Sequence, residues 1–360
     1  MARKFVVACG GTGGHTFPGL AVARELRARG HEVVVWSSGR AIEGAVMKSW
    51  DGAVFSTGAR QLSARNAPAN LLSILRCRRE MKRFAPAALL AMGSYSSLPP
   101  VLAARACRVP VVLHEANTVP GRAVDFLSRY ARKVALSFEE SARHLPKRET
   151  VLTGLPVRTE VAGQTPFEDI PKGAFCVFVT GGSQGAHRVN ELASQALALV
   201  QQEFVKKGDG RRLFVIHQTG AADESAVSTV YADACIPSRI NAFEREMGRA
   251  FASADLVVAR AGASTCFELA LVGRPTFFIP LPSAMRNHQL YNAEAFAKKG
   301  AADVGIQDKL TPRALANYIL HKAANPRSLE EMGAAMRRLA TPDAAARVAD
   351  IVEGCARPEA

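Results

Sequence analysis

Two stretches of the sequence, KFVVACGGTGGH at residues 4–15 and FCVFVTGGSQGA at residues 175–186, decide the fold. Each reads as a short apolar strand that ends in a glycine-rich turn and is followed by apolar residues at helical spacing. Glycine allows positive φ and close approach of other groups, and free N–H groups at a helix start favour phosphate or another anion. The duplication predicts two α/β domains that face one another across a cleft.

Neither glycine turn matches the common nucleotide-binding signatures. In the first turn, Gly-x-Gly-x-x-Gly counted from Gly11 requires a glycine at the position of Thr16. The second strand, which ends at Ser38, lacks the acidic residue that would bind an adenosine ribose. No Gly-x-x-x-x-Gly-Lys-Ser/Thr sequence occurs, which excludes a P-loop. A turn that only closes a strand–helix corner stays open as the alternative to an anion site.

Composition places the chain among globular, strongly basic proteins. Its 360 residues suit two domains, and its formal charge of +14 indicates an acidic partner such as nucleic acid, anionic lipid or a phosphorylated substrate. Seven cysteines without a Cys-x-x-Cys pair argue against a disulfide framework or a zinc site, and favour a reducing compartment. The N-terminal apolar run is too short for a signal peptide, and prolines make the uncharged stretch 84–104 a poor membrane span. We expect a cytosolic protein whose membrane contact, if any, is peripheral.

Strand-like and helical runs alternate along the chain, which is the pattern of parallel sheets with crossover helices. The expected strands are Phe5–Ala8, Val33–Trp36, Ala88–Met92, Val111–Leu113, Lys133–Ser137, Val151–Thr153, Phe175–Val179, Leu213–Gln218, Leu256–Val258 and Thr276–Ile279. Helices are expected at 20–29 and 190–200, and Thr341-Pro342-Asp343 is expected to open a last one. A polar segment at 163–173 separates the two series, so we expect domains at 1–160 and 161–340.

The sequence RAGASTCFEL at residues 260–269 follows a predicted strand and combines small residues with a carboxylate. The small residues predict a tight turn into a helix whose N-terminus faces an anion. Glu268 then lies about one turn inside the helix, where its carboxylate can accept hydrogen bonds from the two hydroxyls of a ribose. This pairing suggests a nucleotide site. An exposed glutamate that only interacts with the helix dipole is the alternative.

Further polar residues follow predicted strands in both halves. His288, Gln289 and Asn292 could hydrogen-bond the hydroxyl and amide groups of a sugar. In the first half, His15 ends the glycine loop and Glu115 follows a strand of its own. An imidazole and a carboxylate at neighbouring strand ends could act as a general base and its orienting partner. No residues have clear metal-ligand spacing, so we expect a leaving diphosphate to be stabilised without a metal.

A basic, amphipathic helix is predicted at 71–84. Its leucines and basic residues include Leu72, Leu75, Arg76, Arg79, Lys82 and Arg83. This combination is typical of an interfacial helix that lies against anionic headgroups. A core-facing helix with a solvated basic side explains the same pattern equally well.

Together, these motifs closely resemble those of the MurG family, the peptidoglycan N-acetylglucosaminyltransferases that act on undecaprenyl-linked intermediates. The matching sequences are GGTGGHTFPGLAVA near the start, HEAN at 114–117, GLPVR at 154–158, GGSQGA at 181–186, HQTG at 217–220, RAGAST with Glu268, and HQLYNA at 288–293. They occur in the family's order over nearly the whole chain, so the resemblance does not depend on one motif.

The resemblance implies a GT-B fold, in which two Rossmann-like domains flank a deep cleft and the last helix, 341–360, packs back on the first domain. It implies an inverting transfer of N-acetylglucosamine from UDP-N-acetylglucosamine to the muramyl 4-hydroxyl of lipid I, undecaprenyl-pyrophosphoryl-muramyl-pentapeptide, to give lipid II. The expected location is the cytoplasmic face of the plasma membrane, held peripherally by an anionic membrane surface. Neither a cofactor nor nucleic acid is implied.

The resemblance also assigns roles to residues. Glu268 would hold the ribose, Phe243 would contact the uracil, and His15 or Glu115 would accept the acceptor's proton. The residues expected to contact the donor are Thr12, Gly13, Gly14, His15, Asn117, Arg158, Ser183, Gln184, Phe243, Ala263, Ser264, Thr265, Glu268, His288 and Gln289. The acceptor side would comprise Gly11, Gly14, Gly93, Ser94, Tyr95 and Asn117.

Some positions depart from the family's pattern. A glutamine pair is usual where His288-Gln289 stand, and HEQN has become HEAN. The usual MGGYVSGP is here MGSYSSLP at residues 92–99, so Ser94 and Leu98 replace glycines that allow close backbone approach on the acceptor side.

Three other functions compete with the transfer to lipid I. UDP-N-acetylglucosamine 2-epimerases share the fold and the donor but need no lipid acceptor, and a transferase that makes glycosyl diacylglycerol differs in its acceptor. A basic nucleic-acid-binding protein would explain the positive charge. However, the chain has no aromatic RNA-binding signature and no recognisable DNA-binding motif.

Overall fold

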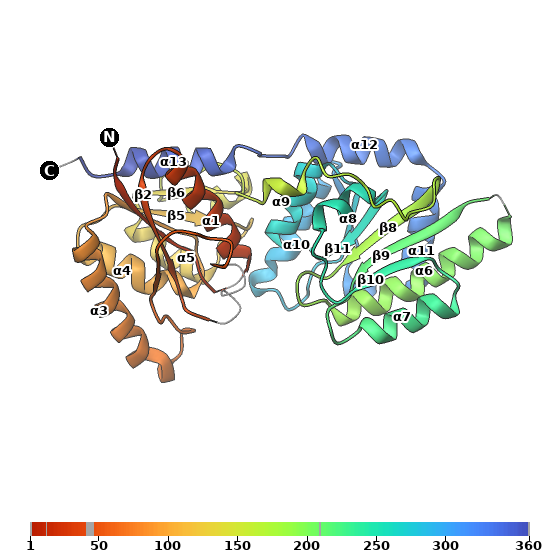
Figure 1. The fold of residues 1–360 in the computed structure, drawn as a ribbon, viewed down its shortest axis with the longest axis horizontal. Helices are drawn as coiled ribbons and strands as arrows, with labels where there is room; N and C mark the ends of the chain where they lie inside the picture. The colour runs from red at the N-terminus through yellow and green to blue at the C-terminus, as the bar shows by residue number, and fades with distance from the viewer. Residues whose placement is uncertain (1, 12, 41–46, 209, 359–360) are drawn as a thin grey trace. The chain divides into compact units, whose positions relative to one another are not determined.

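The computed structural model describes residues 2–11, 13–40, 47–208 and 210–358, and the chain divides into two compact units. The first unit comprises Met1–Arg158 with Thr341–Ala360, and the second comprises Thr159–Ala340. In each unit, helices cover both faces of one sheet (Figure 1). This confirms the predicted α/β class with two parallel-sheet domains.

The first unit is built on a seven-stranded parallel sheet with the order β3-β2-β1-β4-β5-β6-β7. Its strands are β1 (Lys4–Ala8), β2 (Glu32–Ser37), β3 (Val54–Ser56), β4 (Ala88–Ala91), β5 (Val111–Glu115), β6 (Lys133–Leu136) and β7 (Thr150–Leu152). Val6 and Val7 of β1 point to opposite faces, yet neither is exposed to solvent. The sheet is therefore covered on both sides, which is why its central strands read as continuous apolar runs.

Two groups of helices cover this sheet. The helices are α1 (Gly13–Ala28), α3 (Ala67–Phe84), α4 (Leu98–Ala106), α5 (Arg122–Leu127) and α13 (Ala344–Cys355). α1 and α13 pack on the face that carries Phe5, Val7 and Leu90. α3, α4 and α5 pack on the opposite face, around Val6 and Leu89.

The helix α13 completes the core of the first unit although it comes from the far end of the chain. Val348 and Val352 are fully buried in the same cluster as the residues of α1. The helix begins at Ala344 rather than at Thr341 as the sequence predicts, and Asp343 makes no capping hydrogen bond with its side chain. Thr341 packs instead against Gly154, where its hydroxyl oxygen lies 2.1 Å from the position a Cβ would take.

Ion pairs fasten α13 to the end of α1. Arg29 donates to Asp350 at 2.6 Å and also to Glu353, and His31 Nε2 lies 2.6 Å from Glu353 Oε1. Partial burial raises the pKa of the Glu353 carboxyl, but hydrogen bonds from His31 and Arg29 outweigh it and hold the pKa below its ordinary value of 4.5. Ionised Glu353 therefore stabilises the folded unit.

The Glu353→Gln variant is expected to lower the free energy of unfolding by about 1–2 kcal/mol at pH 7, because an amide loses the charged hydrogen bonds. A carboxyl with a lowered folded-state pKa contributes its stability above the unfolded pKa and loses it as the pH falls. The difference from the wild type should therefore be complete at pH 7 and shrink below about pH 4.5. Urea unfolding at several pH values measures it. Asp350→Asn, which changes a more exposed partner of Arg29, is the control with a smaller loss, and an equal loss at every pH would contradict this account.

The second unit is built on a six-stranded parallel sheet with the order β10-β9-β8-β11-β12-β13. Its strands are β8 (Ala174–Thr180), β9 (Arg212–Gln218), β10 (Ser238–Asn241), β11 (Leu256–Ala259), β12 (Thr276–Phe278) and β13 (Ala302–Val304). Its helices are α6 (His187–Lys207), α7 (Glu224–Asp233), α8 (Met247–Ser253), α9 (Ala263–Val272), α10 (His288–Ala297), α11 (Pro312–Ala323) and α12 (Pro326–Arg337). α6, α7 and α11 share one hydrophobic core with the sheet. α8 and α10 also pack on the sheet, through ring contacts of Phe251 with Phe178 and of Phe296 with Phe278.

The expected and the observed elements differ mainly in the edge strands of the two sheets and in where the helix α1 begins. All ten expected strands are present within one or two residues, and β3, β10 and β13 are additional. These three lie at sheet edges, and they are short and partly exposed, so they lack the apolar run of a central strand. α1 begins at Gly13 rather than near Leu20, despite Pro18 within it. Gly19 packs directly on Cys9 at the end of β1, and this contact outweighs the poor helix propensity of the segment.

Candidate functional site

Both sheets reverse their strand order at one place. β1 lies between β2 and β4, and β8 lies between β9 and β11. In open parallel sheets, ligands bind beyond the carboxyl ends of the strands at such a switch point. The two predicted glycine turns leave β1 and β8, and RAGAST leaves β11, so these motifs lie at the switch points of their units.

The second glycine loop, residues 181–186, has a backbone that only glycine permits. Gly182 and Gly185 have φ values of +93° and +74°. A Cβ on Gly185 would lie 1.9 Å from the carbonyl oxygen of Thr219. Ser183 and Gln184 are exposed, and α6 follows without a side-chain cap on its first N–H groups. The start of α6 therefore has N–H groups without a side-chain cap, and the anion site at this loop stays a prediction.

A network of buried polar side chains fixes Thr219, the residue that packs against Gly185 of this loop. His217 Nδ1 lies 2.8 Å from Tyr231 Oη, and its Nε2 lies 3.1 Å from Asn190 Oδ1. The amide of Asn190 donates to Thr219 O at 2.7 Å and to Asp223 Oδ2 at 2.8 Å. Burial lowers the pKa of His217 to about 3, so the imidazole is neutral. Sequence reasoning did not identify this network; its only signal was the polar HQTG sequence directly after a buried strand.

Glu268 lies in the second turn of α9. This helix follows β11, which pairs with β8, the strand that leads into the second glycine loop. The side chain of Glu268 is nearly buried, with 7% of the residue exposed, which removes the alternative of an exposed surface glutamate. Gly262 at the N-cap offers no side-chain cap, so the first N–H groups of α9 are available to an anion. The guanidinium of Arg260 is not the group that binds an anion at this helix start. It donates instead to Ile279 O at 2.9 Å and to Gln307 Oε1 at 2.7 Å.

The predicted sugar contacts lie at the start of α10. His288 Nδ1 is 2.9 Å from Met285 O; since a carbonyl only accepts, Nδ1 carries a proton, which leaves Nε2 for a ligand. Gln289 accepts from Leu281 N at 3.0 Å through Oε1, which leaves its amide hydrogens for a ligand. Asn292 is fully buried and donates to Ala261 O at 3.2 Å. Of the three candidates, Asn292 thus joins α10 to the RAGAST loop.

Phe243 stands on a fixed turn after β10. The residue is 55% exposed, whereas the next residue, Glu244, is buried. The Glu244 carboxylate accepts from Asn241 Nδ2 at 2.9 Å and from Glu246 N at 2.7 Å. These bonds fix the backbone on both sides of Phe243, so an apolar ring is held out to solvent where a flat ligand could stack on it.

In the first unit, the first glycine loop meets the loop that follows β4. A Cβ on Gly11 would lie 2.4 Å from Ser94 Oγ and 3.5 Å from a ring carbon of Tyr95. A Cβ on Gly93 would lie 3.7 Å from His15 Cδ2. The structure therefore brings together Gly11, His15, Gly93, Ser94 and Tyr95, which the sequence analysis placed on one side.

The remaining predicted residues of this loop belong to the start of α1. Gly13 and Gly14 are its first residues, and Thr12 lies outside the described residues. The guanidinium of Arg158, at the end of the GLPVR sequence, lies over the ring of Phe17 with its carbon 4.9 Å from the ring centre. Arg158 is thus held against α1 within the first unit.

The two replaced glycines have different consequences. Ser94 keeps the positive φ of a glycine, at +68°, which is uncommon and costly for a residue with a side chain. Leu98 has φ near −60° in the right-handed helical region, at the start of α4. The acceptor-side backbone therefore retains its glycine-like shape at Ser94, and position 98 does not require glycine.

Glu115 is buried, and its own chain surrounds it. Its Oε1 accepts from Asn117 N at 2.8 Å and from Asn117 Nδ2 at 3.2 Å, and its Oε2 accepts from Gly121 N at 3.0 Å. Burial raises the pKa of Glu115 to about 7 although these hydrogen bonds oppose it. The geometry uses both carboxylate oxygens to hold the turn 116–121. Burial also lowers the pKa of the neighbouring His114 to about 4, so that imidazole is neutral.

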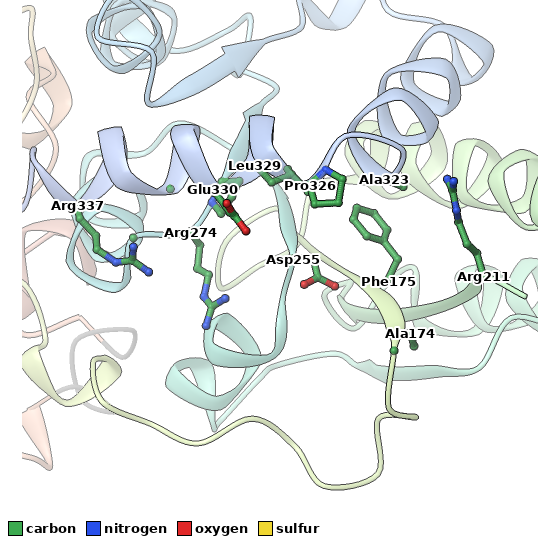
Figure 2. A pocket seen from close by; sticks show the side chains of 14 residues that line it. Ala174, Phe175, Arg211, Asp255, Arg274, Ala323, Pro326, Leu329, Glu330 and Arg337 are labelled. Carbon is green, nitrogen blue, oxygen red and sulfur yellow. The ribbon is translucent and has the colours of Figure 1, made fainter.

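A separate hollow of about 580 Å³ lies at the amino ends of the strands of the second sheet (Figure 2). Phe175, Asp255 and Arg274 line it beneath α12. Arg274 donates to Ala252 O at 2.7 Å, and Asp255 accepts from Cys176 N at 2.7 Å. Its main charged groups therefore hold the fold together, and none of the predicted site residues lines it. We interpret it as the joint between α12 and the sheet.

Comparison with known protein families gives matches to both halves of the chain. Residues 5–136 match the glycosyltransferase family 28 N-terminal domain, and residues 176–348 match the glycosyltransferase family 28 C-terminal domain. A curated relative from Geobacter metallireducens is 37% identical over 96% of this chain and 97% of its own length. It is named UDP-N-acetylglucosamine--N-acetylmuramyl-(pentapeptide) pyrophosphoryl-undecaprenol N-acetylglucosamine transferase.

Solved structures give two informative matches. The crystal structure of Acinetobacter baumannii MurG has a TM-score of 0.79 at 31% identity and covers 98% of this chain and 99% of that one. A UDP-GlcNAc 2-epimerase from Neisseria meningitidis, bound to UDP-GlcNAc, has a TM-score of 0.73 at 12% identity and covers 98% of this chain and 100% of that one. The second match shows a shared fold only.

Proposed function

The chain belongs to the MurG family within glycosyltransferase family 28, and on that premise we propose that it transfers N-acetylglucosamine from UDP-N-acetylglucosamine to lipid I in peptidoglycan synthesis. It is a hexosyltransferase with the two Rossmann-like units of the GT-B class. One observation carries the proposal. The loops that leave the neighbouring strands β8 and β11 lead into the uncapped starts of α6 and α9 at one switch point, and α9 carries the nearly buried carboxylate of Glu268, which suits a nucleoside diphosphate.

The donor is assigned to the second unit. Glu268 accepts hydrogen bonds from the ribose hydroxyls, and the exposed ring of Phe243 stacks on the uracil. N–H groups of the second glycine loop, with Ser183 and Gln184, and of the α9 start, at 263–265, bind the diphosphate. His288 Nε2 and the amide of Gln289 contact the sugar.

The acceptor is assigned to the first unit, around Gly11, His15, Gly93 and Tyr95. His15 accepts the proton of the muramyl 4-hydroxyl while its oxygen forms a bond to the anomeric carbon. The bond from that carbon to the diphosphate breaks, and its electron pair leaves on the β-phosphate oxygen of UDP, where N–H groups stabilise the charge. A single in-line displacement inverts the anomeric configuration. Glu115, whose oxygens already hold a turn, orients the acceptor side rather than acting as the base.

UDP release from UDP-N-acetylglucosamine tests the proposal, measured with and without a short-chain lipid I analogue and with and without a chelator. We expect release only when the analogue is present and no effect of the chelator. Release without an acceptor would identify an epimerase or hydrolase, which the shared fold with a 2-epimerase makes the second candidate. No release under either condition would overturn the transferase function.

The helix α3 supports a proposal about location, namely peripheral association with the cytoplasmic face of the inner membrane. No helix in the described part of the chain is long and apolar enough to cross a membrane. Cys77 and Met81 of α3 face the core, whereas Leu71, Leu72 and Leu75 are 59%, 62% and 52% exposed. Five basic residues of the same helix are also exposed: Arg76, Arg78, Arg79, Lys82 and Arg83. Exposed leucines beside cations suit an anionic lipid surface.

A variant with Leu72→Glu and Leu75→Glu is expected to bind vesicles of anionic phosphatidylglycerol at least about tenfold more weakly than the wild type, because it loses buried apolar area and gains repulsive charge. Vesicle sedimentation at low and high salt measures this binding. Val205→Glu, at another exposed apolar position on the second unit, is the control and should bind like the wild type. Equal binding by all three proteins would remove α3 from the membrane contact.

A further inference from the structure

Gln218, the last residue of β9, makes an unusual contact with the second glycine loop. The residue is 1% exposed, and its Nε2 donates to the carbonyl oxygen of Gly182 at 2.7 Å. Because a carbonyl only accepts, the amide nitrogen must be the atom that faces Gly182. The amide oxygen, Oε1, is buried and has no hydrogen-bond partner within the described ranges.

This contact fixes the orientation of one peptide group. The carbonyl oxygen of Gly182 also accepts from Gly185 N at 2.9 Å, so two donors hold it inward. In a trans peptide, the C=O of one residue and the N–H of the next point in opposite directions. The N–H of Ser183 is therefore directed away from Gln218, on the exposed side of the loop. Gly182, with φ at +93°, is the residue type that can adopt this geometry.

We propose that Gln218 is a positioning residue that holds the peptide between Gly182 and Ser183 with its N–H directed at the donor's diphosphate. The inference rests on the proposed binding of the donor at this loop. If the peptide turned over, the loop would present a carbonyl oxygen to an anion in place of a donor. Gln218 thus acts through the backbone and does not itself touch the diphosphate.

The unfavourable burial of the Gln218 side chain supports this role. A buried amide oxygen without a partner is unfavourable, and an apolar side chain of similar size would avoid that loss. The amide is also held on a rigid base, because Gln218 pairs with Thr180 in the sheet. Asn190 holds the carbonyl of the next residue, Thr219. Both the strand and the following turn are therefore held in place. The side chain of Gln218, which extends from this strand, can hold the glycine loop in one conformation.

The Gln218→Leu variant tests the proposal through the affinities for UDP and for uridine, measured by titration calorimetry. We expect UDP binding to weaken by about 10- to 100-fold, the range for one hydrogen bond to a charged group, while uridine binding changes less than about twofold. The value of kcat/KM should fall by a similar factor. Gln201→Leu removes an amide-to-carbonyl contact elsewhere in the same unit, with Cys235 O at 3.4 Å, and should leave both affinities unchanged.

The measured affinities test the positioning role of Gln218 and the proposed function separately. If Gln218→Leu does not fold, Gln218→Met, which keeps the length of the side chain without a donor, should show the same selective loss of UDP binding. A variant that keeps the wild-type preference for UDP over uridine would overturn the positioning role, and so would equal losses for the two ligands. A wild-type protein that binds UDP no better than uridine would instead overturn the proposed function itself.

Discussion

The Glu268→Ala variant is expected to bind UDP at least about 100-fold more weakly than the wild type, because removal of the carboxylate deprives both ribose hydroxyls of a charged acceptor, each contact contributing about 1.5–3 kcal/mol. Glu268 is nearly buried in α9, so water replaces the lost contact poorly. Titration calorimetry measures the affinity directly. Glu268→Gln, which keeps one accepting oxygen but no charge, should fall between the two proteins.

A sharper form of this experiment changes the ligand as well. The wild type should bind 2′-deoxy-UDP clearly more weakly than UDP, whereas Glu268→Ala should bind the two ligands equally. Glu294→Ala, in α10 of the same unit, is the control and should retain the wild-type discrimination. If Glu268→Ala still distinguished UDP from its deoxy form, the ribose would have to be bound elsewhere.

The His15→Ala variant is expected to lower turnover by about 10²- to 10⁴-fold, the range for loss of a general base, while UDP affinity stays within about twofold of the wild type. The reason is spatial. His15 lies beside Gly93 in the first unit, whereas the groups proposed to bind UDP most directly belong to the second unit. Steady-state rates with a lipid I analogue and calorimetry with UDP separate the two effects.

His144→Ala is the matched control for this change, because His144 is an exposed histidine of the same unit. It should show wild-type turnover and affinity. Near-normal turnover of His15→Ala would exclude His15 as the base and return attention to Glu115. A parallel loss of turnover and UDP affinity would indicate that His15 supports donor binding instead.

Much of the fold could be predicted because parallel strands buried on both faces leave a strong apolar signal. Val33–Trp36 and Leu256–Val258 are such strands, and both are present. The edge strand at Ser238–Asn241 is partly exposed along its whole length and has no such signal. The start of α1 was also beyond prediction, since Pro18 and neighbouring glycines favour a loop locally and only packing against Cys9 makes the segment helical.

In the candidate site, too, features with a local sequence pattern could be predicted, whereas features that depend on packing could not. The glycine loops and Glu268 could be identified because each motif is contiguous and its chemistry follows from its residue types. The bond between Gln218 and Gly182 joins the ends of two strands and depends on their alignment, which no local pattern specifies. Likewise, only the structure shows that Asn292 is buried and that both oxygens of Glu115 are engaged by its own turn.

The position of α13 has a consequence for synthesis on the ribosome. Val348 and Val352 lie in the core of the first unit, whose residues outside the segment 341–360 all precede position 159. A nascent chain can therefore complete the second unit before the first, although the first begins to emerge earlier. Until residues 344–355 leave the exit tunnel, the face of the first sheet that α13 covers stays open. The apolar residues that α13 covers, such as Phe5 and Val7, are therefore accessible to other proteins while the chain is translated.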